Sequence, residues 1–179
     1  MNMKFISFLV VVPLTLLVAC QNEASKEESA KSETSNTSDK SRQEKNKLAA
    51  LANVNAFLSG NTDAMLKDAV PDMVDYNDGS MPPVKGADSI RAGIKQWREC
   101  FSAYSCENIQ ALADGDYVVV IGEWSATFKK DFGTMKVAGK SFKVNDADIY
   151  RFNAEGKMTE HRSVQSSAEM MKQLGVVTP

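Results

Sequence analysis

Two aspartates, Asp146 and Asp148, and the only histidine, His161, lie near one another late in the chain. A carboxylate beside an imidazole can act as a general base or acid, and burial or a like-charged neighbour raises the pKa of a carboxyl. Tyr150 shares their face of a strand, because residues two apart point the same way. The pattern predicts proton transfer with Asp148 as the base and His161 orienting it. The alternative is an Asp–His pair that only stabilises a hairpin.

A predicted hairpin must position these groups, with strands over residues 141–152 and 157–165 and a loop over 153–156. A four-residue loop predicts three cross-strand pairs, namely Asp148 with His161, Asp146 with Ser163 and Tyr150 with Thr159. Side chains paired in this way have Cβ atoms about 4.5–5.5 Å apart, which allows an Asp148–His161 contact. A shift of one residue would put the two on opposite faces, so the prediction depends on the loop.

The rest of the chain reads as helices followed by strands. Apolar residues recur at helical spacing over residues 48–58 and 90–101, and a short helix is predicted near 62–66. The segments 117–128 and 141–152 are rich in β-branched and aromatic residues, which is typical of strands. Helices first and antiparallel strands afterwards predict an α+β fold.

Several motifs of the second half resemble those of the SnoaL-like polyketide cyclases, in the nuclear-transport-factor-2-like superfamily. They are Ala113-Asp-Gly-Asp-Tyr-Val-Val-Val120, Asp148-Ile-Tyr-Arg-Phe152, Gly156-Lys-Met-Thr-Glu-His161 and Gln173-Leu-Gly175. The resemblance implies a cone, in which a curved, mainly antiparallel sheet wraps against about three helices and leaves a pocket. Relatives include cyclases, isomerases, hydrolases and non-catalytic domains, so the fold alone assigns no function. Arg162 and Ser163 stand where the cyclases commonly have Trp and Asp, which argues against cyclase chemistry.

Three further residues are candidates for the pocket. Asp75 and Tyr76 follow the second helix, where the family places residues of the pocket rim. They are equally typical of turn formers, and we favour the turn because Asn77-Asp-Gly79 follows. Trp124, on the long strand, is expected to face the pocket or a partner subunit.

The N-terminus reads as a secretion signal that ends at Cys20. Lys4 supplies a positive start, and residues 5–18 are almost purely apolar but too short to span a bilayer comfortably. The ending Leu17-Val-Ala-Cys20 resembles the lipobox of bacterial lipoproteins, which implies cleavage after residue 19 and a lipid on Cys20. The alternative is an ordinary secreted protein. Gln21 is not the acidic residue that holds many lipoproteins in the inner membrane, so we expect the outer membrane of a bacterial envelope.

The predicted signal and lipidation site divide the chain into a signal over residues 1–19, a lipidated cysteine with a tether over 20–45, and one domain over 46–179. Residues 21–45 carry no aromatic and no large aliphatic side chain, so we expect a disordered stalk. The net charge is only −2 and there is no basic block, which gives no reason to expect nucleic-acid binding.

Cys100 and Cys106 are the two cysteines that remain after Cys20. An oxidising compartment favours a disulfide between them, with two buried free thiols as the alternative. With one histidine and no Cys/His cluster, no metal site is expected. No dinucleotide or phosphate-loop motif is present, and no cofactor is expected.

Three functions remain open from the sequence. The first is a lipid-anchored domain that binds a small, largely apolar molecule in its cone. The second is an enzyme that transfers a proton next to a carbonyl, using Asp148 and His161. The third is a non-catalytic protein–protein module that forms a homodimer.

Overall fold

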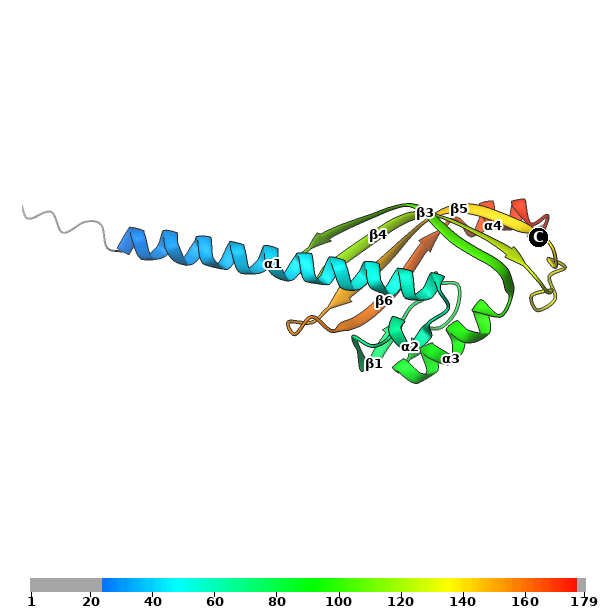
Figure 1. Cartoon of the computed structure of the whole chain (residues 1–179), viewed down its shortest axis with the longest axis horizontal. Helices are drawn as coiled ribbons and strands as arrows, with labels where there is room; N and C mark the ends of the chain where they lie inside the picture. Colours follow the sequence, from blue (N-terminus) through cyan, green and yellow to red (C-terminus); the bar gives the residue numbers. More distant parts are fainter. Residues whose placement is uncertain (1–23, 177–179) are drawn as a thin grey trace, which may run out of the picture. The chain divides into compact units, whose positions relative to one another are not determined.

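The computed structural model describes the backbone of residues 24–176 and the side chains of residues 37–176. Four helices and six strands follow one another (Figure 1), and they are α1 Ala24–Leu58, α2 Thr62–Met65, β1 Ala69–Asp75, β2 Val84–Lys85, α3 Ala87–Arg98, β3 Phe101–Asp114, β4 Tyr117–Phe128, β5 Ser141–Phe152, β6 Met158–Gln165 and α4 Ser167–Gln173. The α+β class predicted from the sequence is confirmed. The predicted signal peptide and Cys20 lie outside the described residues. Within them, no helix is both long enough and apolar enough to cross a membrane.

The six strands form one curved sheet in the order β2-β1-β6-β5-β4-β3. Neighbouring strands are antiparallel except β1 and β6, which run parallel. Buried and more exposed residues alternate along β4, as expected when one face of a strand covers a core and the other meets solvent. The concave face packs against the domain part of α1 and against α3 (Figure 1). The sheet therefore has the predicted cone-like curvature.

Two apolar clusters lie on the concave face. The first joins α1 to the sheet and includes Val54, Val120 and Tyr150. The second lies under α4 and includes Phe142 and Leu174. On β5, inward-facing residues of the two clusters flank Asp146 and Asp148, so these carboxylates lie where the two clusters meet.

Helix α1 begins at Ala24, within the segment for which composition predicts a disordered stalk. The expected stalk over residues 21–45 stays a prediction. The segment lacks large apolar residues, but it also lacks Gly and Pro and carries several Glu and Lys residues, which favour helix. Contacts with the sheet begin before residue 46, because Arg42 forms an ion pair with Asp116 in the β3–β4 turn.

The hairpin of β5 and β6 has a different register from the predicted one. Five residues rather than four join the strands, and Phe152 pairs with Met158. A bulge then leaves Thr159 out of the pairing, so His161 lies opposite Tyr150 rather than Asp148. The longer loop and the bulge together shift the register by two residues. An even shift keeps every side chain on its predicted face.

The predicted disulfide between Cys100 and Cys106 is wrong, since both cysteines are free. Cys106 lies in strand β3, which begins at Phe101. A strand rises about 3.3 Å per residue, which separates the two cysteines by roughly 15–20 Å along β3. Bridged cysteines have Cα atoms no more than about 7 Å apart. Cys100 instead packs among the buried residues of the second cluster, and Cys106 packs against the first.

Candidate functional site

His161 lies between two carboxylates on the concave face. Its Nδ1 is 2.9 Å from Asp75 Oδ1, and its Nε2 is 3.2 Å from Asp148 Oδ1. We call Asp75, His161 and Asp148 the triad. Their side chains are only 11%, 15% and 12% exposed, respectively. The predicted contact between Asp148 and His161 is therefore present, although it is diagonal across the strands and not between directly paired residues.

The parallel pairing of β1 with β6 brings Asp75 to the site. Asp75 pairs with His161, and the Tyr76 amide donates to the His161 carbonyl at 2.9 Å. Asp75 Oδ1 also accepts from the Asn77 amide at 2.9 Å, as a turn-forming aspartate does. Asp75 thus forms the turn favoured from the sequence and also contacts His161. Its contact with His161 joins residues 86 positions apart, and no local pattern in the sequence signals it.

Two carboxylates hold the imidazole in its charged form. Burial alone would lower the pKa of His161, but hydrogen bonds to Asp148 and Asp75, together with their charges, raise it to about 10. Burial likewise opposes ionisation of Asp75, yet the hydrogen bond and charge of His161 and the Asn77 amide lower the pKa of Asp75. At neutral pH His161 is an imidazolium that donates from both ring nitrogens. It is therefore no general base.

Asp146 is the carboxyl next to the triad with the opposite shift. Burial and the neighbouring Asp148 charge raise its pKa, while the Ser163 hydroxyl, which donates to both carboxylate oxygens at 3.0 and 2.8 Å, partly offsets the rise. A carboxyl whose pKa moves toward neutrality is suited to give or take a proton. Ser163, which the sequence pattern offered only as a departure from the family, therefore belongs to the site.

Tyr150 forms the apolar wall behind the imidazole. It is buried, its ring centroid is 5.0 Å from that of His161, and its hydroxyl donates to Asn53 Oδ1 at 3.1 Å. Burial and the nearby carboxylates raise its pKa well above the usual value, so the phenol stays neutral. Asn53 in turn donates to the Met65 carbonyl at 2.7 Å, which anchors the tyrosine to α1 and α2.

Trp124 and Tyr76, both candidates for the pocket, occupy different surroundings. Trp124 is buried on the concave face against Phe57 and Tyr104, and its indole Nε1 has no hydrogen-bond partner. Tyr76 lies outside the triad, where the Arg162 guanidinium stacks 4.6 Å from its ring centroid. Only Trp124 of these two is therefore close to the concave core.

Cys106 lies on the concave face near the same carboxylates. Burial first, and the charges of Asp148 and Asp146 next, raise its pKa to about 11. The thiolate is the nucleophilic form of cysteine, and it is scarce at neutral pH with such a pKa. Among residues 37–176, no group of three or more His, Cys, Asp and Glu side chains is arranged to hold a metal ion.

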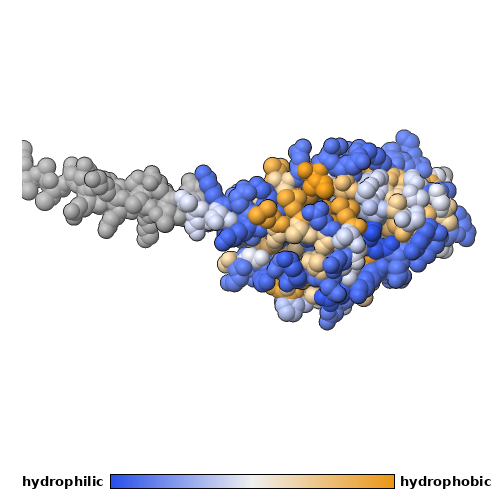
Figure 2. Space-filling model, in the orientation of Figure 1, coloured by the Kyte–Doolittle hydropathy of each residue, from blue (hydrophilic) through white to orange (hydrophobic). Residues whose placement is uncertain are grey.

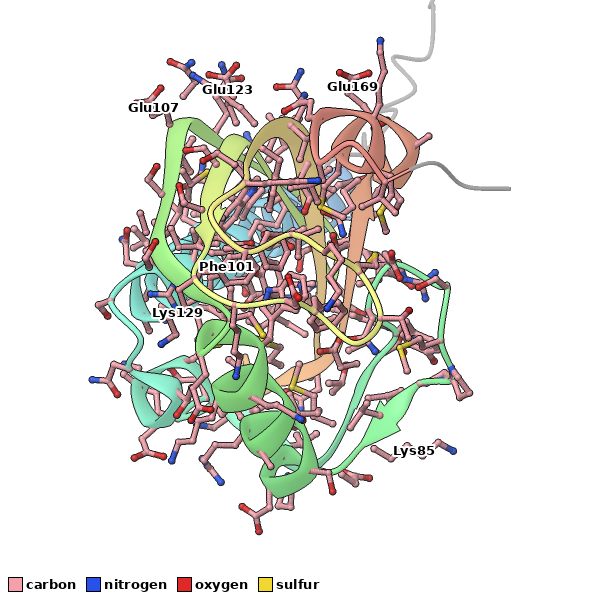
Figure 3. All side chains as sticks on the ribbon, turned by 90° about the vertical axis from the view of Figure 1, so that its right-hand side faces the viewer. Lys85, Phe101, Glu107, Glu123, Lys129 and Glu169 are labelled. Atoms are coloured by element: carbon pink, nitrogen blue, oxygen red, sulfur yellow. The ribbon has the colours of Figure 1, made fainter. Side chains whose placement is uncertain are left out.

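Charged and apolar side chains share the surface of the domain. Figure 2 shows apolar residues gathered amid charged ones on the face in view. In Figure 3 the acidic residues Glu107, Glu123 and Glu169 stand at one end of the domain, whereas Lys129 lies beside α3. Lysines neutralise these glutamates in part, since Lys143 pairs with Glu107 and Glu123 and Lys172 pairs with Glu169.

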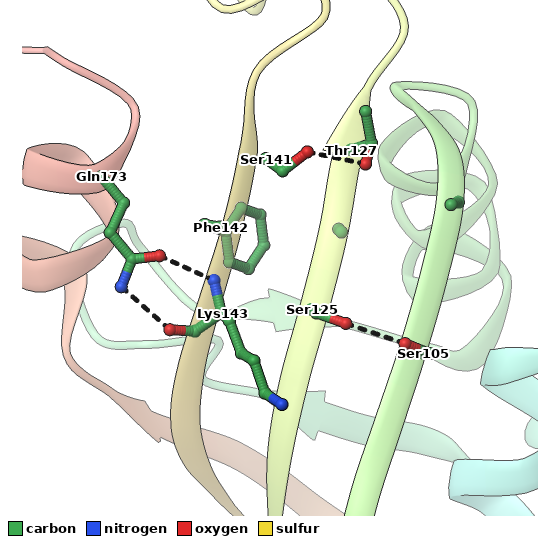
Figure 4. Close-up of a pocket in the computed structure, with 9 residues that line it drawn as sticks. Ser105, Ser125, Thr127, Ser141, Phe142, Lys143 and Gln173 are labelled. Carbon is green, nitrogen blue, oxygen red and sulfur yellow. Dashed lines mark hydrogen bonds between the residues drawn. The ribbon is translucent and has the colours of Figure 1, made fainter.

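Two shallow grooves open on the surface, and neither is lined by the triad. One of about 390 Å³ crosses the outer face of β3, β4 and β5. There Ser105 bonds to Ser125 and Thr127 to Ser141, each at 2.8 Å, and Gln173 bonds to the Lys143 backbone (Figure 4). The other, of about 330 Å³, lies at the ends of α1 and α3. The hydroxyls of the outer groove satisfy one another, so the triad remains the stronger candidate for chemistry.

The fold and the triad together define an α+β domain with a curved sheet and a buried acidic and imidazole site on its concave face. The SnoaL-like polyketide cyclase family matches residues 47–174, and the chain belongs to this family. The resemblance inferred from the sequence motifs is thus confirmed. The chain matches no curated protein.

Solved structures share the fold. A protein from Xanthomonas campestris pv. campestris, proposed to be a polyketide cyclase, is 15% identical, with a TM-score of 0.69 over 74% of this chain and 98% of its own. An NTF2-like protein from Burkholderia thailandensis E264 is 20% identical, with a TM-score of 0.60 over 75% and 98%. An LEH-like epoxide hydrolase from M. tuberculosis is 15% identical, with a TM-score of 0.59 over 74% and 90%. Such low identities establish the fold and leave the function to the site.

Proposed function

We propose that this protein is a lipid-anchored SnoaL-like domain of the bacterial cell envelope that binds a small, largely apolar molecule against the triad. The observation that carries the proposal is the imidazolium of His161, held between Asp75 and Asp148 at the meeting of two apolar clusters. Burying three charged groups is costly, and stability alone gives little reason to retain them. Perturbed titratable groups on an apolar concave face are typical of ligand sites.

The charges of the triad indicate what kind of molecule would bind. One imidazolium between two carboxylates leaves one net negative charge, and Asp146 adds a further acidic group. An anionic ligand would be repelled. The site therefore suits a neutral or cationic molecule that has an apolar body and a group able to hydrogen-bond to a carboxyl.

Proton transfer next to a carbonyl is the second candidate function. The raised pKa of Asp146 favours it, because a base must lose and regain its proton near the working pH. Asp148, the base expected from the sequence, is already bonded to the imidazolium. If the protein is an enzyme, Asp146 would transfer the proton. The charges of Asp148 and His161 would then set the electrostatic field around it.

The proposed location in the cell envelope rests on the sequence of the first 21 residues. The apolar run, the lipobox-like ending at Cys20 and Gln21 after it support a lipid on Cys20 and an outer-membrane location. The lipid would be the protein's contact with the membrane.

A homodimer through the outer face of the sheet is a separate proposal about assembly. Three large apolar side chains on that face are exposed, namely Leu112 at 62%, Val164 at 58% and Ile121 at 41%. Val119 and Ile149 pair with one another between them on the same face. Ile121→Lys should then abolish a dimer seen by sedimentation equilibrium, whereas a monomeric native protein would contradict the proposal.

Native mass spectrometry of the protein purified from its own membrane tests ligand binding. A bound small molecule should be present on the native chain and depleted on the Asp146→Asn and His161→Gln variants. Asp114→Asn is the matched control, because Asp114 is an exposed carboxylate on a β3 edge away from the triad. A native chain that carries no molecule, or equal loading of all four proteins, would refute the proposal.

A further inference from the structure

A groove at the helix ends of the domain is lined by three cations and one acidic residue. It lies between the end of α1, the start of α2, the last turn of α3 and the residue that follows β4. Its lining residues are Gly60, Thr62, Lys95, Arg98, Glu99 and Lys129. Figure 3 shows Lys129 beside α3, with Lys85 at a distant edge of the domain. The groove shares no residue with the triad.

The cations of this groove have no carboxylate partners among residues 37–176. Lysines elsewhere, such as Lys143 and Lys157, form ion pairs at 2.7 and 3.3 Å. None of Lys95, Arg98 and Lys129 lies within 4.0 Å of an acidic oxygen in that part of the chain. Three unpaired cations in one groove are notable in a chain whose net charge is −2. Their mutual repulsion would be relieved by a bound anion.

Arg98 is held in place before any anion arrives. Its guanidinium carbon lies 5.5 Å from the centroid of the Phe57 ring and 5.1 Å from that of Tyr104. One nitrogen, Nη2, donates to the Leu58 carbonyl at 3.3 Å, while the buried Nε has no partner. A guanidinium fixed by stacking loses little side-chain entropy when it binds an anion. Donors on the fork remain free, since only one of its hydrogen bonds is to protein.

The negative ends of the helix dipoles offset only part of the positive charge in the groove. Lys95 and Arg98 lie in the last turn of α3, where cations offset the negative end of the helix. That end carries about half an elementary charge, and the end of α1 about as much again. Glu99 contributes one full negative charge. The three positive charges exceed this total of about two negative charges. Lys129 belongs to no helix, so no helix dipole explains its place in the groove.

We propose that this groove binds a phosphate group. A phosphate carries up to two charges and several oxygens, which suits one arginine fork and two lysines better than a single carboxylate would. The phosphate could come from the headgroup of a lipid or from a soluble phosphorylated molecule. The proposal is independent of the ligand proposed at the triad.

Titration of the full chain with inorganic phosphate, followed by amide NMR, tests the groove. Amide signals of Gly60 and Lys129 should shift and saturate in the millimolar range. The double variant Lys95→Gln/Lys129→Gln should weaken binding by about tenfold or more, because each charge-assisted contact is worth that much. Lys85→Gln, which removes an exposed lysine elsewhere, should change it less than about twofold. Shifts that do not saturate, or equal weakening by both variants, would overturn the proposal.

A competitor distinguishes the two sources of phosphate. Dihexanoyl-phosphatidylglycerol is a soluble lipid with one phosphodiester, and dihexanoyl-phosphatidylcholine is its zwitterionic counterpart. Displacement of phosphate by the first lipid alone would support a lipid headgroup as the ligand. Saturable phosphate binding that neither lipid displaces would support a soluble phosphorylated molecule. Failure of the chain to bind inorganic phosphate or either lipid overturns the proposal and leaves the triad untouched.

Discussion

His161 is the residue on which the chemistry of this protein depends. Each of its ring nitrogens faces a carboxylate, so the imidazole is charged at neutral pH and is fixed in orientation. The neighbouring Asp146 is left as the carboxyl with a raised pKa. The site thus holds a fixed positive charge on His161 beside a titratable acid, Asp146. Active sites use such pairs of neighbouring groups, whose environments move their pKa values apart.

Removing either carboxylate of the triad should lower the pKa of His161. Asp148→Asn and Asp75→Asn each delete one charged acceptor, and we expect a fall of about one unit or more, equivalent to about 1.4 kcal/mol per unit. NMR titration of the imidazole measures the shift, with Asp114→Asn as the control. An unchanged titration curve in both triad variants would show that neither carboxylate stabilises the charged imidazole.

The triad also predicts how stability depends on pH. The pKa of His161 is raised on folding, so its contribution is complete below the unfolded value of about 6.5 and is lost as pH rises toward about 10. The pKa of Asp75 is lowered, so its contribution is present above about 3.9 and is lost at more acidic pH. Urea unfolding at several pH values should show both losses, and His161→Gln should remove the alkaline one. A wild-type stability that stays flat from pH 6 to pH 10 would contradict this account.

Asp146→Asn should raise the free energy of unfolding at pH 7. The folded state raises the pKa of Asp146, which means that it disfavours the ionised form, and asparagine removes that cost while keeping an acceptor for Ser163. The gain should disappear as pH falls below the unfolded value of about 3.9, where the aspartate is protonated in both states. Thermal unfolding of the two proteins at pH 7 and pH 3.5 measures it. A variant less stable than wild type at pH 7 would indicate a structural role for the charge.

At the scale of elements, the β5–β6 hairpin and the β3–β4 pair build the concave face. The bulge at Thr159 shifts the register of the hairpin by one residue and the longer loop by another, so His161 still points inward. On β4, Gly122 lies opposite Asp146 in β5, and the missing side chain leaves room for Cys106 from β3. The Cys106 thiol therefore occupies the space that a side chain at residue 122 would take.

Gly122→Ala should destabilise the domain. A Cβ at this position would lie 2.3 Å from Cys106 Sγ, so the thiol or the strand must move. We expect a loss of about 1–3 kcal/mol, as for other overpacked cores. In a Cys106→Ala background the same change should cost much less, because the clashing atom is gone. Urea unfolding of the four proteins gives the coupling energy, and purely additive effects would place the cost in the backbone instead.

At the scale of the whole molecule, the domain belongs to the SnoaL-like family, and we propose that a lipid holds it at a membrane. Helix α1 runs from Ala24 to Leu58, so the segment after the proposed lipid is helical over most of its length.

Cys20→Ser should release the protein from the membrane fraction or leave its signal uncleaved. Serine has no thiol to receive a lipid, so the anchor cannot form. Cell fractionation followed by mass measurement of the mature chain separates the two results. Cys100→Ser is the control, because Cys100 is buried in the domain and has no proposed part in anchoring. Normal processing with unchanged membrane fractionation of Cys20→Ser would exclude the lipid anchor.

Local periodicity was sufficient to predict the part of the site on β5 and β6. Strand alternation puts Asp146, Asp148 and Tyr150 on one face whatever the loop, and the even shift in register keeps His161 on that face too. The same periodicity, with helices before antiparallel strands, predicted the α+β class, and short motifs predicted the family. These properties depend on residues near one another in the sequence, which explains why they could be inferred without the tertiary structure.

Only the tertiary structure decided the second partner of His161 and the state of the cysteines. Asp75 meets His161 through a parallel pairing of strands distant in sequence, and no spacing rule predicts which strands become neighbours. Cys100 and Cys106 are close in sequence, but the extended strand β3 holds them apart. Contacts between distant segments thus determined the charge of His161, and with it which carboxyl can titrate.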